Sequence, residues 1–341
     1  MNARQRDLFF QMKKFIILTT ISPPNDEMLE WFSRFPEWHI VIVGDLKTHD
    51  ESWKNAPVEY LSIARQDELF PELSRCAPRN HYCRKNIGYL YAINQNAELI
   101  WETDDDTFPY TDAFSNLKSH VTGRLVGEKD WINVYRYFTD TGIWPRGLPL
   151  DETTETGTVL DKDHVRDCPI QQFLVDEDPD VDAIWRLLNP EARVSFDPCA
   201  EPVILDQGSM VPFNSQNTVF YPSAYPLLYL PHYANFRMTD IWRSFVAQVC
   251  LWIQDHNLAF HTASAVQKRN PHDLLADFKD EVPGYLHNRE IGHFLKEKSL
   301  KQTVSGTDVQ ECARELWLGM IGQGFLPEQE RPLIDAWFDS F

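Results

Sequence analysis

Four short apolar segments alternate with helical segments in the first hundred residues, and this alternation constrains the fold most strongly. The strand-like segments are Lys14–Thr20, His39–Gly44, Val58–Leu61 and Glu98–Trp101. Asn25 or Asp26 can begin a helix that runs to about Phe35, and apolar residues recur at helical spacing between Arg84 and Asn94. Strands that alternate with helices predict an α/β fold with a mostly parallel, Rossmann-like sheet.

Polar residues follow three of these predicted strands. Thr19 and Thr20 end the first, Asp45 follows the second, and Glu102-Thr-Asp-Asp-Asp106 follows the fourth. Ligands of such sheets bind at the carboxyl ends of the strands. We therefore expect these residues to meet at one binding site.

The aspartate run 104–106 is the most informative of these strand ends. Neighbouring carboxylates raise one another's pKa values or attract a cation, and oxygen ligands on a short loop suit Mg²⁺ or Mn²⁺. A strand that ends in D-x-D is typical of GT-A glycosyltransferases, whose metal holds the diphosphate of a nucleotide sugar. The ligand pair is either Asp104 with Asp106 or Glu102 with Asp104. The alternative is a solvated acidic turn.

Two further segments can contact a nucleotide. Asp45 either hydrogen-bonds the base or ribose or serves as a turn residue after Gly44. Arg84, Lys85 and Asn86 begin the second helix, where they either meet the phosphates of a donor or form a solvated first turn.

Several longer motifs resemble those of STELLO-type glycosyltransferases. The most specific are Trp144-Pro-Arg-Gly-Leu-Pro-Leu150 and Val211-Pro-Phe-Asn-Ser-Gln-Asn-Thr218. Further matches are Ile42–Thr48, Arg84–Ile93, Asp178–Ile184 and Thr239–Arg243. The resemblance runs from about residue 15 to 295, and the chain is more distantly similar to the plant reversibly glycosylated polypeptides.

The resemblance implies a GT-A-like fold and a nucleotide-sugar donor. With the aspartate run it predicts a metal-dependent transfer of sugar, with a UDP-sugar favoured as donor. The acidic charge of the chain favours a glycan or lipid-linked sugar over a polyanion as acceptor. Donor-binding candidates are Thr19, Thr20, Asp45, Lys47, Arg84, Lys85, Asn86, Asp104, Asp105 and Arg146. Where the family has D-A-D-D-R, this chain has Glu102–Asp106; Asp104 and Asp105 match and Asp106 departs, which leaves the direct metal ligand open. The alternatives are a nucleotide-sugar mutase and a non-catalytic scaffold.

The acceptor side offers four candidates. Asp240, at the start of an amphipathic helix over 238–255, is either the catalytic base or a stabiliser of the first helical turn. Arg243 binds the diphosphate or pairs with Asp240. His261 is either a third metal ligand or a buried histidine, and Arg146 either clamps a phosphate or sugar carboxylate or has a structural role.

Domain organisation follows the same pattern. We expect a catalytic domain at 12–295, with a nucleotide-binding half at about 12–130 and an irregular acceptor half at about 131–295. A helical C-terminal appendage at 296–341 completes the chain.

Composition restricts the partners and the compartment. The net charge of −19 disfavours nucleic acids and anionic membranes, while 43% hydrophobic residues exclude general disorder. The chain shows no signal-peptide pattern and no apolar window of transmembrane length. Its six cysteines form no C-x-x-C pair, which is typical of a reducing compartment. We therefore expect a cytoplasmic protein without a transmembrane segment.

Overall fold

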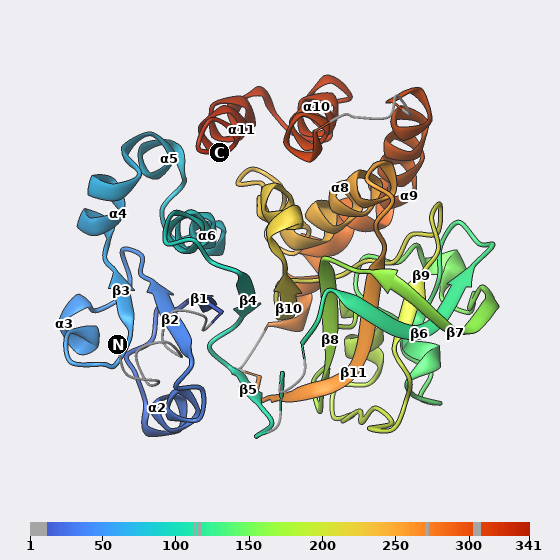
Figure 1. Ribbon diagram of the computed structural model, residues 1–341, viewed down its shortest axis with the longest axis horizontal. Helices are drawn as coiled ribbons and strands as arrows, with labels where there is room; N and C mark the ends of the chain where they lie inside the picture. Colours follow the sequence, from blue (N-terminus) through green and yellow to red (C-terminus); the bar gives the residue numbers. More distant parts are fainter. Residues whose placement is uncertain (1–11, 112, 115–116, 270–272, 303–307) are drawn as a thin grey trace, which may run out of the picture.

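One large mixed sheet runs through the computed structural model (Figure 1), which describes residues 12–111, 113–114, 117–269, 273–302 and 308–341. Its strand order is β3-β2-β1-β4-β10-β8-β11-β9-β6-β7, and β5 pairs with β11. The strands are β1 (Lys14–Thr19), β2 (Trp38–Val43), β3 (Glu59–Leu61), β4 (Leu99–Thr103), β5 (Thr107–Pro109), β6 (His120–Gly127), β7 (Thr158–Asp167), β8 (Ile170–Asp176), β9 (Val203–Leu205), β10 (Asn217–Phe220) and β11 (Leu258–Gln267).

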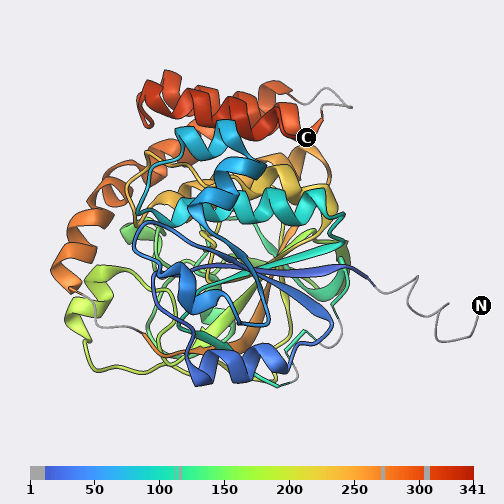
Figure 2. The ribbon, with the colours of Figure 1, turned by 90° about the vertical axis from the view of Figure 1, so that its left-hand side faces the viewer.

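Helices cover both faces of the sheet. Figure 2 shows α2 on one side and α6 and α8 on the other, with α10 and α11 outermost. The α-helices are α2 (Asp26–Ser33), α3 (Asp50–Trp53), α4 (Ile63–Leu69), α5 (Pro71–Cys76), α6 (Lys85–Asn94), α7 (Ala183–Leu188), α8 (Thr239–Ile253), α9 (Leu274–Gln302), α10 (Val309–Gly322) and α11 (Arg331–Phe338). The 3₁₀ helices are η1 (Tyr82–Arg84), η2 (Val134–Tyr137), η3 (Leu150–Glu152), η4 (Pro222–Leu228) and η5 (Glu328–Glu330).

The two faces of the sheet bury two separate cores because successive strand residues point to opposite sides. In β1, Ile16 and Leu18 join the core beneath α2, whereas Phe15 and Ile17 join the larger core that α6, α8, α10 and α11 share. Strands β1 and β2 are therefore apolar over most of their length, as in sheets that are covered on both sides.

The N-terminal half of the sheet agrees with the sequence prediction. Strands β3, β2, β1 and β4 are parallel, and the side chain of Asn25 caps α2 by accepting a hydrogen bond from Met28 N at 2.8 Å. The other half differs, because β10 runs antiparallel to both β4 and β8 and the whole sheet is mixed rather than mostly parallel. The middle of the chain was expected to form irregular segments and short strands laid over the sheet, but its strands β7, β8, β9 and β10 extend the sheet itself.

The C-terminal helices pack on the body of the protein. Trp317 of α10 and Trp337 of α11 are buried in the larger core, and Glu330 of η5 accepts hydrogen bonds from the backbone N–H groups of His232 and Tyr233. Position 296, the predicted domain boundary, lies inside α9. Within the described residues, no helix is both long and apolar enough to cross a membrane.

Gly88 sets how closely α6 approaches the sheet. A Cβ atom at this position would lie 2.6 Å from a methyl group of Val43 and 2.7 Å from one of Ile17. Gly88→Ala is therefore expected to lower the free energy of unfolding by about 1–3 kcal/mol, because overpacking outweighs the higher helix propensity of alanine. Urea denaturation measures this change. A variant as stable as the unmodified protein would show that α6 can move away without cost.

Candidate active site

A cavity of about 630 Å³ opens at the edge of the sheet where six strands have their carboxyl ends. Since β10 is antiparallel to β4 and β8, and β11 is parallel to β8, strands β1, β2, β3, β4, β8 and β11 all point the same way. The residues after β1, β2, β4, β8 and β11, together with those before β10, line the cavity. Its size and its place at the carboxyl ends of strands are typical of ligand sites.

Thr20 and Asp45 form the part of the cavity next to β1 and β2. Thr20 Oγ1 donates to Asp105 Oδ2 at 2.6 Å, and its carbonyl accepts from Thr48 Oγ1 at 2.7 Å. Asp45 Oδ2 accepts from the backbone N–H of His81 at 3.1 Å. Burial lowers the pKa of His81 to about 4, so its imidazole is neutral at physiological pH. Thr19 and the exposed Lys47 line the same part.

The three aspartates that follow β4 differ in their partners. Asp104 Oδ1 accepts from Lys85 Nζ at 2.9 Å, and 39% of the Asp104 side chain is exposed. Burial, and to a lesser extent the charge of Asp104, raises the pKa of Asp105. The carboxylate of Asp106 accepts from Gln267 Nε2 at 3.2 Å. All three line the cavity.

Arg84, Lys85 and Asn86 were predicted to meet donor phosphates, but their side chains are buried and already paired. Arg84 lines the cavity and uses all five guanidinium N–H groups on Gln66, Ser74 and the carbonyl of Ala77. The three N–H groups of the Lys85 ammonium donate to Asp104 and to the carbonyls of Thr103 and Ser215. Asn86 binds the backbone of Leu230. The burial of these three side chains follows from the packing of α6 and of the turn before it, which sequence periodicity does not specify.

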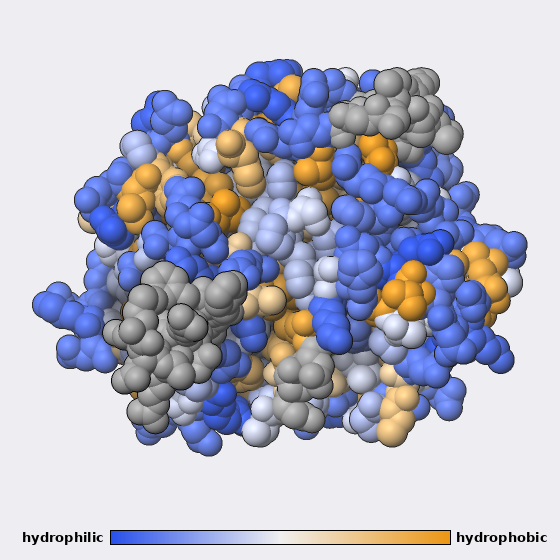
Figure 3. All heavy atoms as spheres, in the orientation of Figure 1, coloured by the Kyte–Doolittle hydropathy of each residue, from blue (hydrophilic) through white to orange (hydrophobic). Residues whose placement is uncertain are grey.

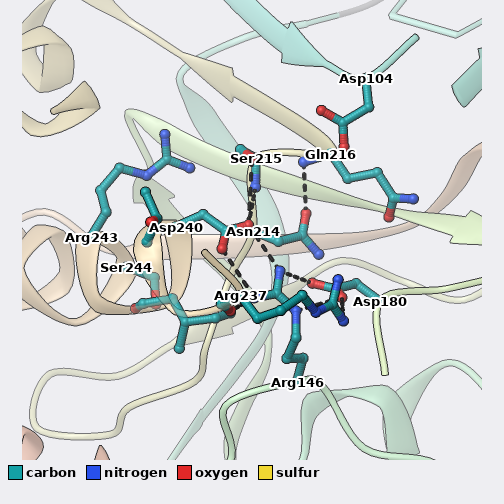
Figure 4. Close-up of polar contacts among 12 residues, drawn as sticks. Asp104, Arg146, Asp180, Asn214, Ser215, Gln216, Arg237, Asp240, Arg243 and Ser244 are labelled. Atoms are coloured by element: carbon teal, nitrogen blue, oxygen red, sulfur yellow. Dashed lines mark hydrogen bonds and ion pairs between the residues drawn. The ribbon is translucent and has the colours of Figure 1, made fainter. Parts of the chain in front are cut away.

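Arg146 lies between two carboxylates at the centre of the site (Figure 4). Its Nε and Nη2 donate to Asp180 at 2.8 Å each, and its Nη1 and Nη2 donate to Asp240 at 3.1 and 3.0 Å. Nη1 also donates to the carbonyl of Arg237. Every N–H of Arg146 thus has a partner within the protein. These contacts fit the structural role that was the alternative for this residue.

Asp240 is held as an anion. Burial favours its neutral form, but the charge and hydrogen bonds of Arg146 outweigh burial and bring its pKa to about 2. Ser215 N also donates to Asp240 Oδ2 at 3.1 Å. A carboxylate with so low a pKa accepts protons weakly. Its contacts thus position the Asn214–Gln216 segment, which lines the cavity, against the first turn of α8.

Arg243 and His261 lie outside this cavity. Arg243 forms a buried ion pair with Glu102 at 2.6 and 2.8 Å, where the predicted alternatives were the diphosphate or Asp240. Both carboxylate oxygens of Glu102, the alternative metal ligand, are engaged in this ion pair. His261 stacks on Phe173 with ring centroids 4.4 Å apart and lines a separate cavity of about 300 Å³. The structure therefore does not bring His261 to Asp104 and Asp106.

Sequence reasoning assigned no role to four charged residues of the site: Asp180, Arg186, Arg237 and Arg269. All four line the cavity, from the segment after β8, from α7, from the residues before α8 and from the segment after β11. The apolar run of β8 followed by Asp176 was the available signal, because it repeats the pattern of a strand with a polar end.

Comparisons with known proteins agree with these motifs. A family model described as "STELLO glycosyltransferases" matches residues 237–341, which include Asp240. Two proteins of Arabidopsis thaliana, "Probable glycosyltransferase STELLO1" and "Probable glycosyltransferase STELLO2", are 27% and 28% identical over 97% of this chain. The resemblance to the STELLO glycosyltransferases is confirmed. The chain spans 44% and 45% of the lengths of these two STELLO proteins.

Proposed function

We propose that this chain is a metal-dependent glycosyltransferase of GT-A type, which moves a sugar from a nucleoside-diphosphate sugar to a hydroxyl acceptor. Similarity to STELLO glycosyltransferases supports the reaction class. The observation that carries the donor and metal assignment is the meeting of the Asp104–Asp106 run with Thr20 and Asp45 in one cavity. This arrangement offers polar partners for a nucleoside beside carboxylates for a cation.

The carboxylates of Asp104 and Asp106 fit Mn²⁺ or Mg²⁺. Among the described residues there is no cluster of three or more His, Cys, Asp or Glu side chains able to hold a metal. Magnesium sites beside diphosphates ordinarily use one or two carboxylates, with waters and phosphate oxygens completing the coordination. Two partly exposed carboxylates on a cavity wall match that requirement. When bound, the cation supplies charge stabilisation to the departing diphosphate.

The residues of the chain then act by binding and positioning. Asp45 and Thr20 take the nucleoside side, and Lys47 is the predicted donor contact whose amine stays exposed at this wall. Lys85 orients Asp104, and Ser215 joins Lys85 to Asp240 through its carbonyl and its N–H. In this scheme Asp240 and Arg146 hold the acceptor side rigid, which keeps reacting groups aligned. Asp240 becomes a base only if acceptor binding displaces one of its partners.

Calorimetric titration with UDP, GDP and CDP tests the donor and metal assignments. We expect one of these nucleotides, with UDP favoured, to bind in the presence of Mn²⁺ and to lose affinity when EDTA removes the metal. Incubation of candidate sugar nucleotides without acceptor separates transfer from isomerisation, because a mutase would convert the donor alone. If the folded protein binds no nucleotide with Mn²⁺, the donor and metal assignments are wrong.

A further inference from the structure

The cavity has a second charged wall, opposite in sign to the aspartate wall. Arg186, Arg237 and Arg269 line it, and their side chains are 8%, 15% and 13% exposed. They come from α7, from the residues before α8 and from the segment after β11, so three separate parts of the chain converge there.

The carboxylates closest to these arginines are not part of the described cavity lining. Arg186 pairs with Asp178, Arg237 with Glu281 at 2.8 Å, and Arg269 with Asp277 at 2.8 Å. The described cavity lining includes none of these three acids. These three acids therefore lie outside the cavity lining, whereas Asp180, whose carboxylate is 3.8 Å from Arg237, is part of it.

Within the part of the chain that the structure describes, each of these arginines has N–H groups beyond those that its carboxylate partner accepts from. Arg186 Nε is buried without a hydrogen-bond partner in the described structure. Arg237 uses Nε and Nη2 on Glu281, and Arg269 uses Nη2 on Asp277. Arg84 and Arg146 differ, since every N–H of their guanidinium groups is engaged.

The positive charges also oppose one another. Burial, followed by the charges of Arg186 and Arg237, lowers the pKa of Arg269 to about 10. An oxyanion placed among the three guanidinium groups would relieve this repulsion through charge-assisted hydrogen bonds.

A continuous series of polar contacts joins the two walls, so the aspartate run and Arg237 lie at its opposite ends. It runs from Asp104 through Lys85, Ser215, Asp240, Arg146 and Asp180 to Arg237, and part of it is visible in Figure 4. The aspartate wall suits the cation and the donor's diphosphate. The arginine wall is thus left for a different anionic group.

We infer that Arg186, Arg237 and Arg269 bind an acidic group of the acceptor, a carboxylate or a phosphate monoester. This inference rests on the proposed transfer reaction and adds the chemical class of its acceptor. The acidic net charge of the chain disfavours anionic partners in general. A strongly acidic protein can nevertheless bind an anion where cations are concentrated.

Binding measurements with small acidic sugars test the inference on the full chain. Glucose 6-phosphate and glucuronate are titrated into protein saturated with UDP and Mn²⁺, with glucose as the neutral control. We expect at least one acidic sugar to bind at least about tenfold more tightly than glucose, since hydrogen bonds to charged groups carry that much affinity. Equal weak binding of all three would overturn the inference.

Variants then locate the site. Arg269→Gln should weaken binding of the acidic sugar at least about tenfold and leave UDP–Mn²⁺ affinity within about twofold, while Arg269→Lys retains part of the binding. Arg289→Gln is the matched control, because Arg289 pairs with Asp151 and Glu152 outside the cavity lining. Thermal melting checks that each variant is folded, and Arg186→Gln repeats the test at a second side chain.

Two outcomes separate this inference from the proposed function. If UDP–Mn²⁺ displaces the acidic sugar and Arg269→Gln weakens UDP–Mn²⁺ instead, the arginine wall serves the donor's diphosphate and the acceptor inference is wrong. If UDP–Mn²⁺ fails to bind but Arg269→Gln still abolishes acidic-sugar binding, the anion site stands and the donor assignment fails.

Discussion

Asp104→Asn is expected to weaken Mn²⁺-dependent nucleotide binding by more than about 100-fold, since removal of even an indirect partner of a metal costs about 10–100-fold. The asparagine oxygen can still accept the hydrogen bond from Lys85 Nζ, which is 2.9 Å from Asp104 Oδ1. The substitution therefore removes a charge and a proposed metal ligand while the buried lysine keeps a partner. Calorimetry with UDP and Mn²⁺ measures the loss.

The control for Asp104→Asn is a similar change away from the cavity. Asp163→Asn removes one negative charge from the largely exposed strand β7, and we expect unchanged nucleotide affinity. Asp106→Asn should resemble Asp104→Asn if both carboxylates hold the cation. Wild-type affinity in Asp104→Asn would exclude the aspartate run as the metal site.

Glu102→Gln is expected to lower the free energy of unfolding by about 3–5 kcal/mol, because it leaves the buried charge of Arg243 without its counter-ion. Both side chains are almost wholly buried, and Tyr89 also donates its hydroxyl to Glu102. Arg243 packs over the rings of Phe213 and Phe220, which cannot replace a carboxylate. Urea denaturation measures the loss.

Two comparisons isolate this buried pair. Replacing both partners, as Glu102→Gln with Arg243→Met, should recover much of the stability, because the uncompensated charge is gone. The exposed Glu51–Lys54 pair is the surface reference, and Glu51→Gln should cost no more than about 1 kcal/mol. A change below about 1 kcal/mol for Glu102→Gln would mean that water or a rearranged side chain solvates Arg243.

Local sequence patterns predicted the N-terminal half of the sheet well. Strands β1, β2 and β4 and helices α6 and α8 lie within two residues of their predicted bounds, because strand and helix periodicity depends on residues near one another in the chain. The strands between 158 and 220 were less predictable. They are paired with strands far away in the sequence, and their residues show less regular alternation.

Among the site residues, too, those that follow a strand were predictable and those that depend on distant partners were not. Thr20, Asp45 and the aspartate run were predicted to converge because each follows a strand, and they line one cavity. The roles of the cations depended on distant partners. Arg146 meets Asp240, 94 residues away in sequence, and Arg243 meets Glu102, 141 residues away.

By itself, the sequence determined that several strands would end in polar residues that meet at one edge of a sheet, since strand ends and the alternation of strands with helices are visible in neighbouring residues. Only the tertiary structure decided which cations are available to a ligand. Arg84, Lys85 and Arg146 have every donor engaged within the protein, whereas Arg186, Arg237 and Arg269 line the cavity with N–H groups that hydrogen-bond to no other described residue. The physical reason is that a buried charge takes the nearest counter-charge or carbonyl that the fold supplies, and that partner can come from anywhere in the chain.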